Sequence, residues 1–380
     1  MGALDPFIGV LYAGLENTNR EMTGFLRSAA RNAEATQAAK GQMVYAPIAD
    51  AAKPVEIIPG ASAPDVTNPD VDKVGITIEH EYAIQVKLDG NETLGLSSSG
   101  NYNRVLQSRI ENAYRQLANL AEKDVAAKAI AGASRAYGDG TKSMFSTKDS
   151  LEEFAQMAKI LDENGCPEDG RNIVLSNSAM ASLRSFSFMN KANELGSDEF
   201  VRYGYTEPIV GFKLWKSAGL GVHKAGNGTG YKTAAEVKTG VKDITVDSGT
   251  GALLAGDVVT IDGNSYVVGK GTDAPGIISL NRPGLMQDVA TGTALTSVGN
   301  YAPCVAFHED AIQVALRAPA LPVGGDSAVD STIVFDPASG LVFRVSMYKQ
   351  YHQTILEIGL AYGSAVMRSE NVAVLADKAV

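Results

Sequence analysis

The sequence predicts a mixed α+β chain that contains a long strand, a long helix, an α/β region and an inserted all-β module. Apolar and polar residues alternate from Val74 to Leu88, which is typical of a strand with one buried face. A helical pattern without proline follows and ends at Gly132. Residues 222–300 hold 14 of the 39 glycines and lack helical periodicity, so they are predicted to form a separate β module.

The first 45 residues predict an N-terminal arm with broken helices. Apolar residues recur at helical spacing after Asp5-Pro6, a favourable helix start: Phe7, Ile8, Leu11 and Leu15. The alanine-rich stretch that follows, from Arg27 to Lys40, is compatible with a helix or with an arm that orders on a neighbour. No signal peptide is expected, because Asp5 stands where a basic region would be required.

The long strand follows a stretch that excludes a helix. Prolines recur there every five residues, at Pro54, Pro59, Pro64 and Pro69. A long strand with such an interrupted partner is equally compatible with a projecting hairpin, which would be marginal alone in water, and with an ordinary strand within one domain. If the hairpin packs on a neighbouring subunit, Asp at both Ile78 and Ile84 should block assembly and leave a folded monomer.

The long helix would extend about 45 Å at 1.5 Å per residue, so it is expected to cross a whole domain. Glu111 with Arg115, and Asp124 with Lys128, are predicted to pair along it. The α/β region is then predicted to contain helices at 151–164 and 178–189 and strands at 172–176 and 209–216.

The β module consists of short β runs separated by turns. Asp262-Gly263-Asn264 is a tight-turn signal between two of these runs. We hypothesise that residues 223–300 fold as an independent β-barrel. The remainder, 301–380, is predicted to consist mostly of strands.

The charge of the chain argues against specific binding of nucleic acid. Its 33 basic and 43 acidic residues give a formal net charge of -10. Phosphate binding needs a concentrated basic patch, and no run of Lys and Arg occurs. The strongest objection comes from the basic residues of the long helix: Arg104, Arg109 and Lys123. Glu111 and Asp124 are interleaved with them and are expected to repel phosphate.

No pattern of catalytic or metal-ligating residues stands out. None of the four histidines has ligand spacing. His308-Glu309-Asp310 is more typical of a turn than of a ligand group. The glycine-containing segment Gly249–Leu254 does not follow a strand and open a helix, as a phosphate-binding loop does. Glu79 and Glu81 are more typical of a solvated or salt-bridging strand face than of acid/base chemistry. The sequence therefore predicts a structural protein without cofactor or metal, and not an enzyme.

Composition also bounds the environment of the chain. No apolar run reaches the roughly 18 residues that a membrane span requires. The only cysteines, Cys166 and Cys304, are far apart and predict no disulfide framework, which favours a reducing cytosol.

The order of these elements resembles the Hong Kong 97-type fold of tailed-bacteriophage capsid subunits, and within it the P-twenty-two-type coat proteins with an insertion domain. Three segments carry the local resemblance: TVDSGTGALLAGDVVTIDGNSYVVGKG, NYAPCVAFHEDAIQVALRAPALP and QTILEIGLAYGSAVMRSENVAVL. The resemblance implies the following division: an N-terminal arm at 1–45, an E-loop hairpin at 46–95, the spine helix and P-domain at 96–145, the first part of the A-domain at 146–222, the inserted β domain at 223–300, and the returning A-domain and P-domain strands at 301–380.

The resemblance implies a major capsid protein that self-assembles, as hexamers and pentamers, into an icosahedral procapsid around a scaffolding protein. It further implies a portal protein as partner, expansion as double-stranded DNA is packaged, and a virion assembled in the host bacterial cytoplasm. The DNA would be enclosed without specific binding, and no membrane would be involved.

Intersubunit contacts are expected along the long strand and the start of the helix, at Ile78, Glu79, Glu81, Ile84, Lys87, Arg104 and Arg109. The cross-linking chemistry of the fold's namesake is not transferred, because it needs a particular Lys and Asn pair. Lys87 lies near the hairpin, but no motif places an Asn partner. The alternatives are an encapsulin-like compartment of the same fold and, from another class, a soluble α/β enzyme.

Overall fold

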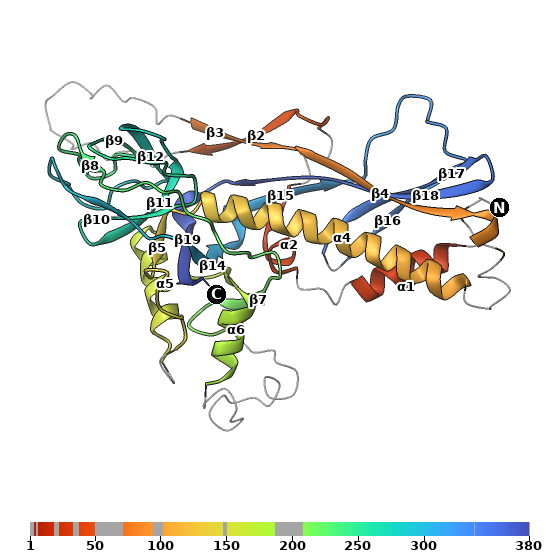
Figure 1. Ribbon diagram of the computed structural model, residues 1–380, viewed down its shortest axis with the longest axis horizontal. Coiled ribbons are helices and arrows are strands. Elements are labelled where there is room, and N and C mark those ends of the chain that lie inside the picture. Colours follow the sequence, from red (N-terminus) through yellow and green to blue (C-terminus); the bar gives the residue numbers. More distant parts are fainter. Residues whose placement is uncertain are drawn as a thin grey trace, which may run out of the picture.

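The structure is a computed structural model of an elongated molecule (Figure 1). It describes residues 4, 7–18, 23–32, 38–49, 71–92, 94, 102–146, 150–186, 208–337 and 339–379. The inserted module occupies one end of the long axis, and the strands β16 to β18 occupy the other. The proline-rich stretch and residues 187–207 lie outside the described residues.

A six-stranded sheet forms one half of the body. Its strands are β1 (Ala30–Arg31), β15 (Ile312–Arg317), β18 (Gln353–Val366), β17 (Val342–Gln350), β16 (Asp330–Phe335) and β4 (His80–Asp89). β18 is central, because β4 pairs along one of its edges while β17 and β15 pair along the other. β16 lies at the edge of this sheet.

The predicted long helix is α4 (Tyr102–Ala131), which lies across the six-stranded sheet along the long axis of the molecule (Figure 1). Its apolar stripe is buried between the sheet and α1 (Ile8–Thr18), through Leu106, Ile110, Ala113, Leu117 and Ala121. Leu120 of the same helix lies outside this buried stripe and is 41% exposed. The helix forms where the pattern predicts because three-to-four-residue spacing places these side chains on one face.

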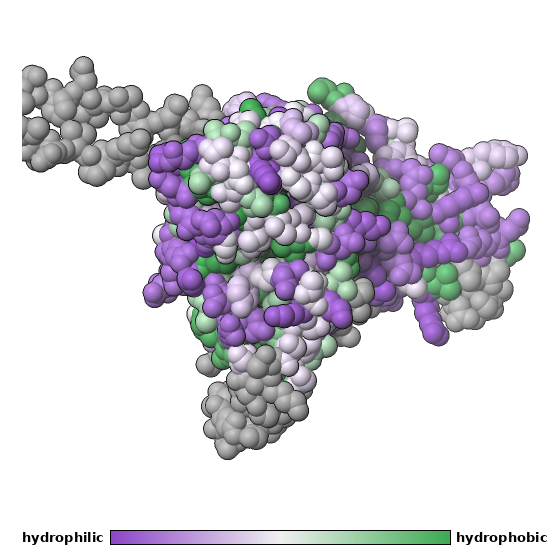
Figure 2. Space-filling view, turned by 60° about the vertical axis from the view of Figure 1, so that its left-hand side comes forward, coloured by the Kyte–Doolittle hydropathy of each residue, from purple (hydrophilic) through white to green (hydrophobic). Residues whose placement is uncertain are grey.

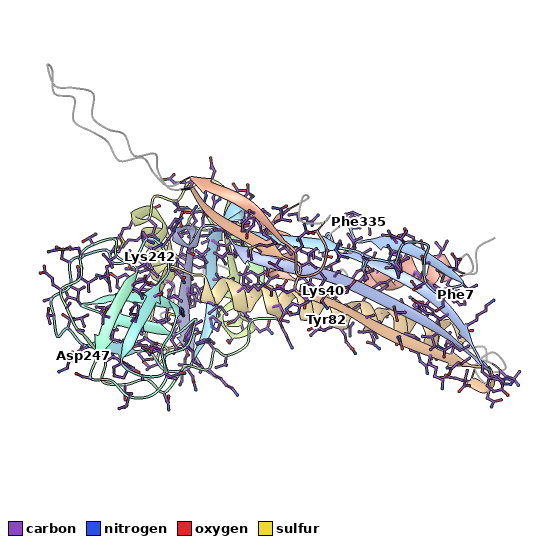
Figure 3. All side chains as sticks on the ribbon, turned by 90° about the horizontal axis from the view of Figure 1, so that it is seen from above. Phe7, Lys40, Tyr82, Lys242, Asp247 and Phe335 are labelled. Carbon is purple, nitrogen blue, oxygen red and sulfur yellow. The ribbon has the colours of Figure 1, made fainter. Side chains whose placement is uncertain are left out.

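The predicted continuous strand is two strands. β3 (Val71–Thr77) pairs with β2 (Met43–Ala49) in a separate hairpin, and β4 resumes at His80 in the six-stranded sheet. The expectation that one hairpin spans 46–95 is therefore wrong for β4. That strand has its partner, β18, within the same chain, whereas the β2–β3 hairpin branches away from the sheet (Figures 1 and 3).

The second half of the body is the predicted α/β region. Its sheet contains β7 (Lys213–Lys216), β6 (Arg171–Leu175), β14 (Tyr301–His308), β19 (Val372–Lys378) and β5 (Arg135–Tyr137). α5 (Glu152–Glu163) and α6 (Asn177–Arg184) cover one face with a core of their own, and α2 (Gly24–Ser28) packs with α4 on the other. The first predicted helix and the first predicted strand are confirmed within one residue. The second helix ends at Arg184, five residues before the predicted end, and the second strand begins at Lys213, four residues after the predicted start.

The inserted module is a closed barrel. Its strands are β8 (Lys232–Thr233), β9 (Asp243–Asp247), β12 (Gly276–Leu280), β11 (Asn264–Lys270), β10 (Val258–Ile261) and β13 (Leu295–Ser297), each paired with the next. A bridge between Lys232 and Ala294 closes the ring. The predicted turn is confirmed, since Asp262 and Gly263 both have positive φ angles between β10 and β11.

The barrel joins the body at β11, which pairs with β5 through Tyr266 and Arg135. The chain enters and leaves at a bridge between His223 and Tyr301. Figure 2 views this end of the molecule and shows a surface of mainly hydrophilic and neutral residues over the barrel. The described α+β class with an inserted barrel-like domain is therefore as predicted.

The barrel should fold when it is separated from the rest of the chain. Its buried core, from Tyr231 to Leu295, is drawn entirely from the module itself. A fragment of residues 222–301 should therefore give dispersed amide signals in NMR spectra and a cooperative thermal melt. As a control, Val259→Asp places a charge at a fully buried position of that core and should abolish the melt. A disordered spectrum of the parent fragment would show that the barrel needs the body.

Candidate assembly surfaces

The base of the β2–β3 hairpin holds a cluster of polar side chains, from β3–β4, α4 and β18. Lys128 Nζ donates hydrogen bonds to Glu79 Oε2 (2.8 Å) and to the carbonyl oxygen of Ser364 (2.9 Å). The Tyr362 hydroxyl donates to Asp124, and His80 Nε2 lies 3.5 Å from Asp124 Oδ2. Asp124 and Lys128 therefore contact the sheet and do not form the expected pair along the helix.

Burial raises the pKa of the Tyr362 hydroxyl well above its ordinary value, and its hydrogen bond to Asp124 raises it further. The hydroxyl is therefore a permanent donor to the Asp124 carboxylate over the physiological pH range. This bond ties the helix to the sheet beside the point where the hairpin leaves the body.

The crossing of the chain over β18 explains a glycine of the C-terminal segment. A Cβ on Gly363 would lie 2.0 Å from the carbonyl oxygen of Thr77 and 3.0 Å from Ile78 Cα. Backbone atoms cannot yield as a flexible side chain can, so the end of β3 approaches β18 this closely only at glycine. The direction in which the hairpin leaves is thereby fixed by packing within the chain.

Glu122 of α4 joins the N-terminal arm to the body. Its carboxylate accepts hydrogen bonds from the amides of Phe25 (2.8 Å) and Leu26 (3.0 Å) and from the Ser217 hydroxyl (2.6 Å). The side chain is buried, and burial raises its pKa while these hydrogen bonds lower it less. A carboxylate at the first turn of α2 satisfies amides that have no partner inside that helix.

Two strands expose apolar side chains in different parts of the molecule. On β2, Met43 and Tyr45 are 47% and 56% exposed. On and beside the edge strand β16, Val329, Ile333 and Phe335 are each about half exposed, while Val334 between them is buried. Figure 3 shows Phe335 far from the barrel, which is marked there by Lys242 and Asp247.

The two exposed apolar residues of β16 lie on the face of the sheet opposite to α4. Ile333 is directly across from Arg344 and Phe335 from Val342, whereas Val334 is across from the buried Phe343. Beside this row a groove of about 380 Å³ runs between the loop at 319–326 and the sheet. Edge strands with exposed apolar side chains are ready to pair with another chain.

The residues predicted to make intersubunit contacts fall in different environments. Ile78 is fully buried against Ile76, Ala315, Ala361 and Met367 of its own chain, so its expected role as a direct contact is wrong. The proposed Asp substitution there would disrupt the subunit itself, because it would bury a charge in this core.

The other predicted contacts are at least partly accessible. Ile84 is partly buried under α4, and Glu81 lines the groove beside the loop. Lys87 and Arg104 are exposed. Arg109 forms an ion pair with Glu92, and Glu79 bonds to Lys128 as described above. The contact roles of these six residues remain predictions.

Sequence reasoning missed Ile333 and Phe335, although they alternate with Val334 in a short strand. Alternation identifies a strand but does not show that it lies at an edge. It also missed Glu122, since a single acidic residue in a helix gives no signal of burial.

The polar clusters considered for chemistry have structural roles. The ring of His308 accepts a hydrogen bond from the amide of Asp310 at a turn, as expected. Gly249 packs so closely on Tyr231 that a Cβ would lie 2.1 Å from its ring. Among the described residues, no group of three or more His, Cys, Asp or Glu side chains could hold a metal ion. In the same part of the chain, no helix has both the length and the apolar character of a membrane span.

The described elements follow the order predicted from the sequence: an arm, a hairpin, a long helix, an α/β domain with an inserted barrel, and returning strands. This is the order of elements on which the sequence-based prediction of a Hong Kong 97-type fold rests.

No protein-family model matches the sequence, and no curated protein matches it either. The chain is similar to a structure of Mycobacterium phage Che8, with 15% identity, a TM-score of 0.48 and coverage of 91% of this chain and 88% of the other. It is also similar to the capsid structure of the cyanophage P-SCSP1u, with 13% identity, a TM-score of 0.47 and coverage of 92% of this chain and 86% of the other. A third similar structure is that of a virus-like particle from Pyrococcus furiosus, with 10% identity, a TM-score of 0.41 and coverage of 97% of this chain and 99% of the other. These are distant likenesses of overall arrangement.

Proposed function

We propose that this chain is the shell-forming subunit of a tailed-phage capsid, which encloses double-stranded DNA in an icosahedral particle. The observation that carries the proposal is the pair of uncovered strand surfaces, on the β2–β3 hairpin and on β16. Two different surfaces that complement each other give head-to-tail contacts, which generate rings and larger closed or open assemblies.

The hairpin is the element best suited to reach a neighbour. β2 and β3 pair only with each other among the described strands, and the hairpin packs on the body near its base, through Ile76. A two-stranded hairpin is at best marginally stable without a further partner. Its exposed Met43 and Tyr45 would be covered by an adjacent subunit. Hexamers and pentamers, assembly with a scaffolding and a portal protein in the host cytoplasm, and expansion during packaging are parts of this proposal.

The proposal is tested by the state of the purified chain. At high protein concentration we expect particles or sheets of megadalton size, seen by sedimentation velocity and negative-stain electron microscopy. Met43→Glu/Tyr45→Glu should shift the protein to small oligomers, while the far-ultraviolet circular dichroism is retained, because both side chains are exposed on β2. If the full chain stays a monomer or small oligomer at every concentration, the proposed function is wrong.

A further inference from the structure

The exposed face of α4 carries no acidic side chain in the part of the helix whose side chains are described. The exposed positions are occupied by Arg104, Ser108, Asn112, Arg115, Gln116, Leu120, Lys123 and Ala127. This face is therefore basic and rich in hydrogen-bond donors, although the whole chain has a formal net charge of -10.

The acidic residues of the helix are turned to other partners. Asp124 accepts the hydrogen bond of Tyr362 at the hairpin base, and Glu122 is buried under the N-terminal arm. Glu111 is half-buried at the border of the face, where Gln107 donates to it (2.9 Å). Asp124 therefore bonds on the sheet side of the helix, and its side chain is 37% exposed. The expectation that interleaved acids repel phosphate stays a prediction.

The dimensions of this face suit an extended anion. Arg104 and Lys123 are 19 positions apart, which is roughly 28 Å along a helix that rises 1.5 Å per residue. Duplex DNA presents one negative charge per about 1.7 Å of its axis. Arginine, lysine and the side-chain amides of Asn112 and Gln116 are all common donors to phosphate oxygens.

We propose that the exposed face of α4 binds the phosphate backbone of duplex DNA, without sequence preference. The inference rests on the proposed function, because a capsid wall meets packaged DNA at close range. Arg104 and Lys123, which form no ion pair within the described residues, supply its strongest contacts. Nonspecific contacts of this kind hold DNA weakly and reversibly, as a wall that must release its genome requires.

The test is a fluorescence-anisotropy titration of unassembled subunits with a labelled duplex of about 30 base pairs, at 50 and 150 mM salt. We compare the parent with Arg104→Gln/Lys123→Gln and with Lys232→Gln/Lys242→Gln, which makes the same charge change at exposed positions of the barrel. The α4 variant should bind at least tenfold more weakly than the parent. Its salt slope should be lower by up to about 1.8, since each neutralised phosphate contributes about 0.9. The barrel variant should stay within twofold of the parent.

Equal binding by the parent and the α4 variant would overturn the inference. The inference would also be overturned if the parent showed no affinity for DNA at 50 mM salt and the α4 variant failed to assemble. The exposed face of α4 would then contact a neighbouring protein and not DNA. Thermal melts establish that both variants are folded. Electron microscopy of the parent separates the two proposals: shells without DNA binding leave the proposed function intact, whereas the absence of any assembly counts against that function.

Discussion

Replacing Glu122 with alanine should destabilise the subunit by about 3 kcal/mol. The substitution leaves the amides of Phe25 and Leu26 and the Ser217 hydroxyl without their acceptor in a buried site. Each unsatisfied buried polar group costs about 1–3 kcal/mol, and part of that cost is recovered if water enters. The change in the free energy of unfolding is measured by urea denaturation of the unassembled subunit.

The matched control for this prediction is Gln116→Ala, at an exposed position of the same helix. It should change the free energy of unfolding by no more than about 0.5 kcal/mol. The arm should also loosen in Glu122→Ala, so that amides near Phe25 exchange with solvent faster than in the parent. A cost below about 1 kcal/mol would show that Glu122 does not hold the arm to the body.

The effect of Glu122 should depend on pH in a defined direction. Burial raises its pKa in the folded subunit above the ordinary value of 4.5. A group whose pKa is raised by folding contributes most to stability when the pH is below its pKa in the unfolded chain. That contribution is lost as the pH rises through its pKa in the folded subunit. The difference in unfolding free energy between the parent and Glu122→Ala should therefore be larger near pH 4.5 than at neutral pH.

Placing glutamate at both Ile333 and Phe335 should prevent assembly while leaving the subunit folded. Both side chains are about half exposed on the face of β16 opposite to α4, so the stability of the monomer changes little when they are replaced. In an assembly, burying an apolar side chain of this size contributes about 1.5–3 kcal/mol. A loss of about 3 kcal/mol per contact raises the concentration needed for assembly about a hundredfold.

The comparison variant carries glutamate at Leu254 and Ile277, which are 45% and 58% exposed on the barrel. It makes the same change in charge, and a similar loss of apolar surface, away from β16, and it should assemble near the parent concentration. Assembly is followed by light scattering, and folding by thermal melts of both variants. If the β16 variant assembles as the parent does, this strand is not part of the interface.

The sequence by itself determined the local elements of this protein. The periodicity of residues 101–131 and the terminal Gly132 identified α4, because a helix that packs on one side must repeat its apolar residues every three to four positions. The composition shift after residue 222 and the Asp262-Gly263-Asn264 turn identified the β module. The sequence shows no pattern typical of a metal site or a catalytic nucleophile, which favoured a structural protein over an enzyme.

Only the tertiary structure decided which surfaces meet. The alternation from Val74 to Leu88 showed a strand with one buried face, but burial against the subunit's own sheet and burial against a neighbour give the same pattern. The partner of β4 is β18, more than 260 positions away in the chain, and the strand breaks at Ile78–Glu79, where it crosses Gly363.

The same limit applies to the charged residues of α4. Spacing along the helix paired Asp124 with Lys128, whereas the sheet offers Tyr362 and Glu79 as closer partners. Glu122 and Lys123 are neighbours in the sequence, yet one is buried under the arm and the other faces solvent. Periodicity gives the direction in which each side chain points around the helix axis. What lies in that direction depends on contacts between distant segments, which carry no local signature.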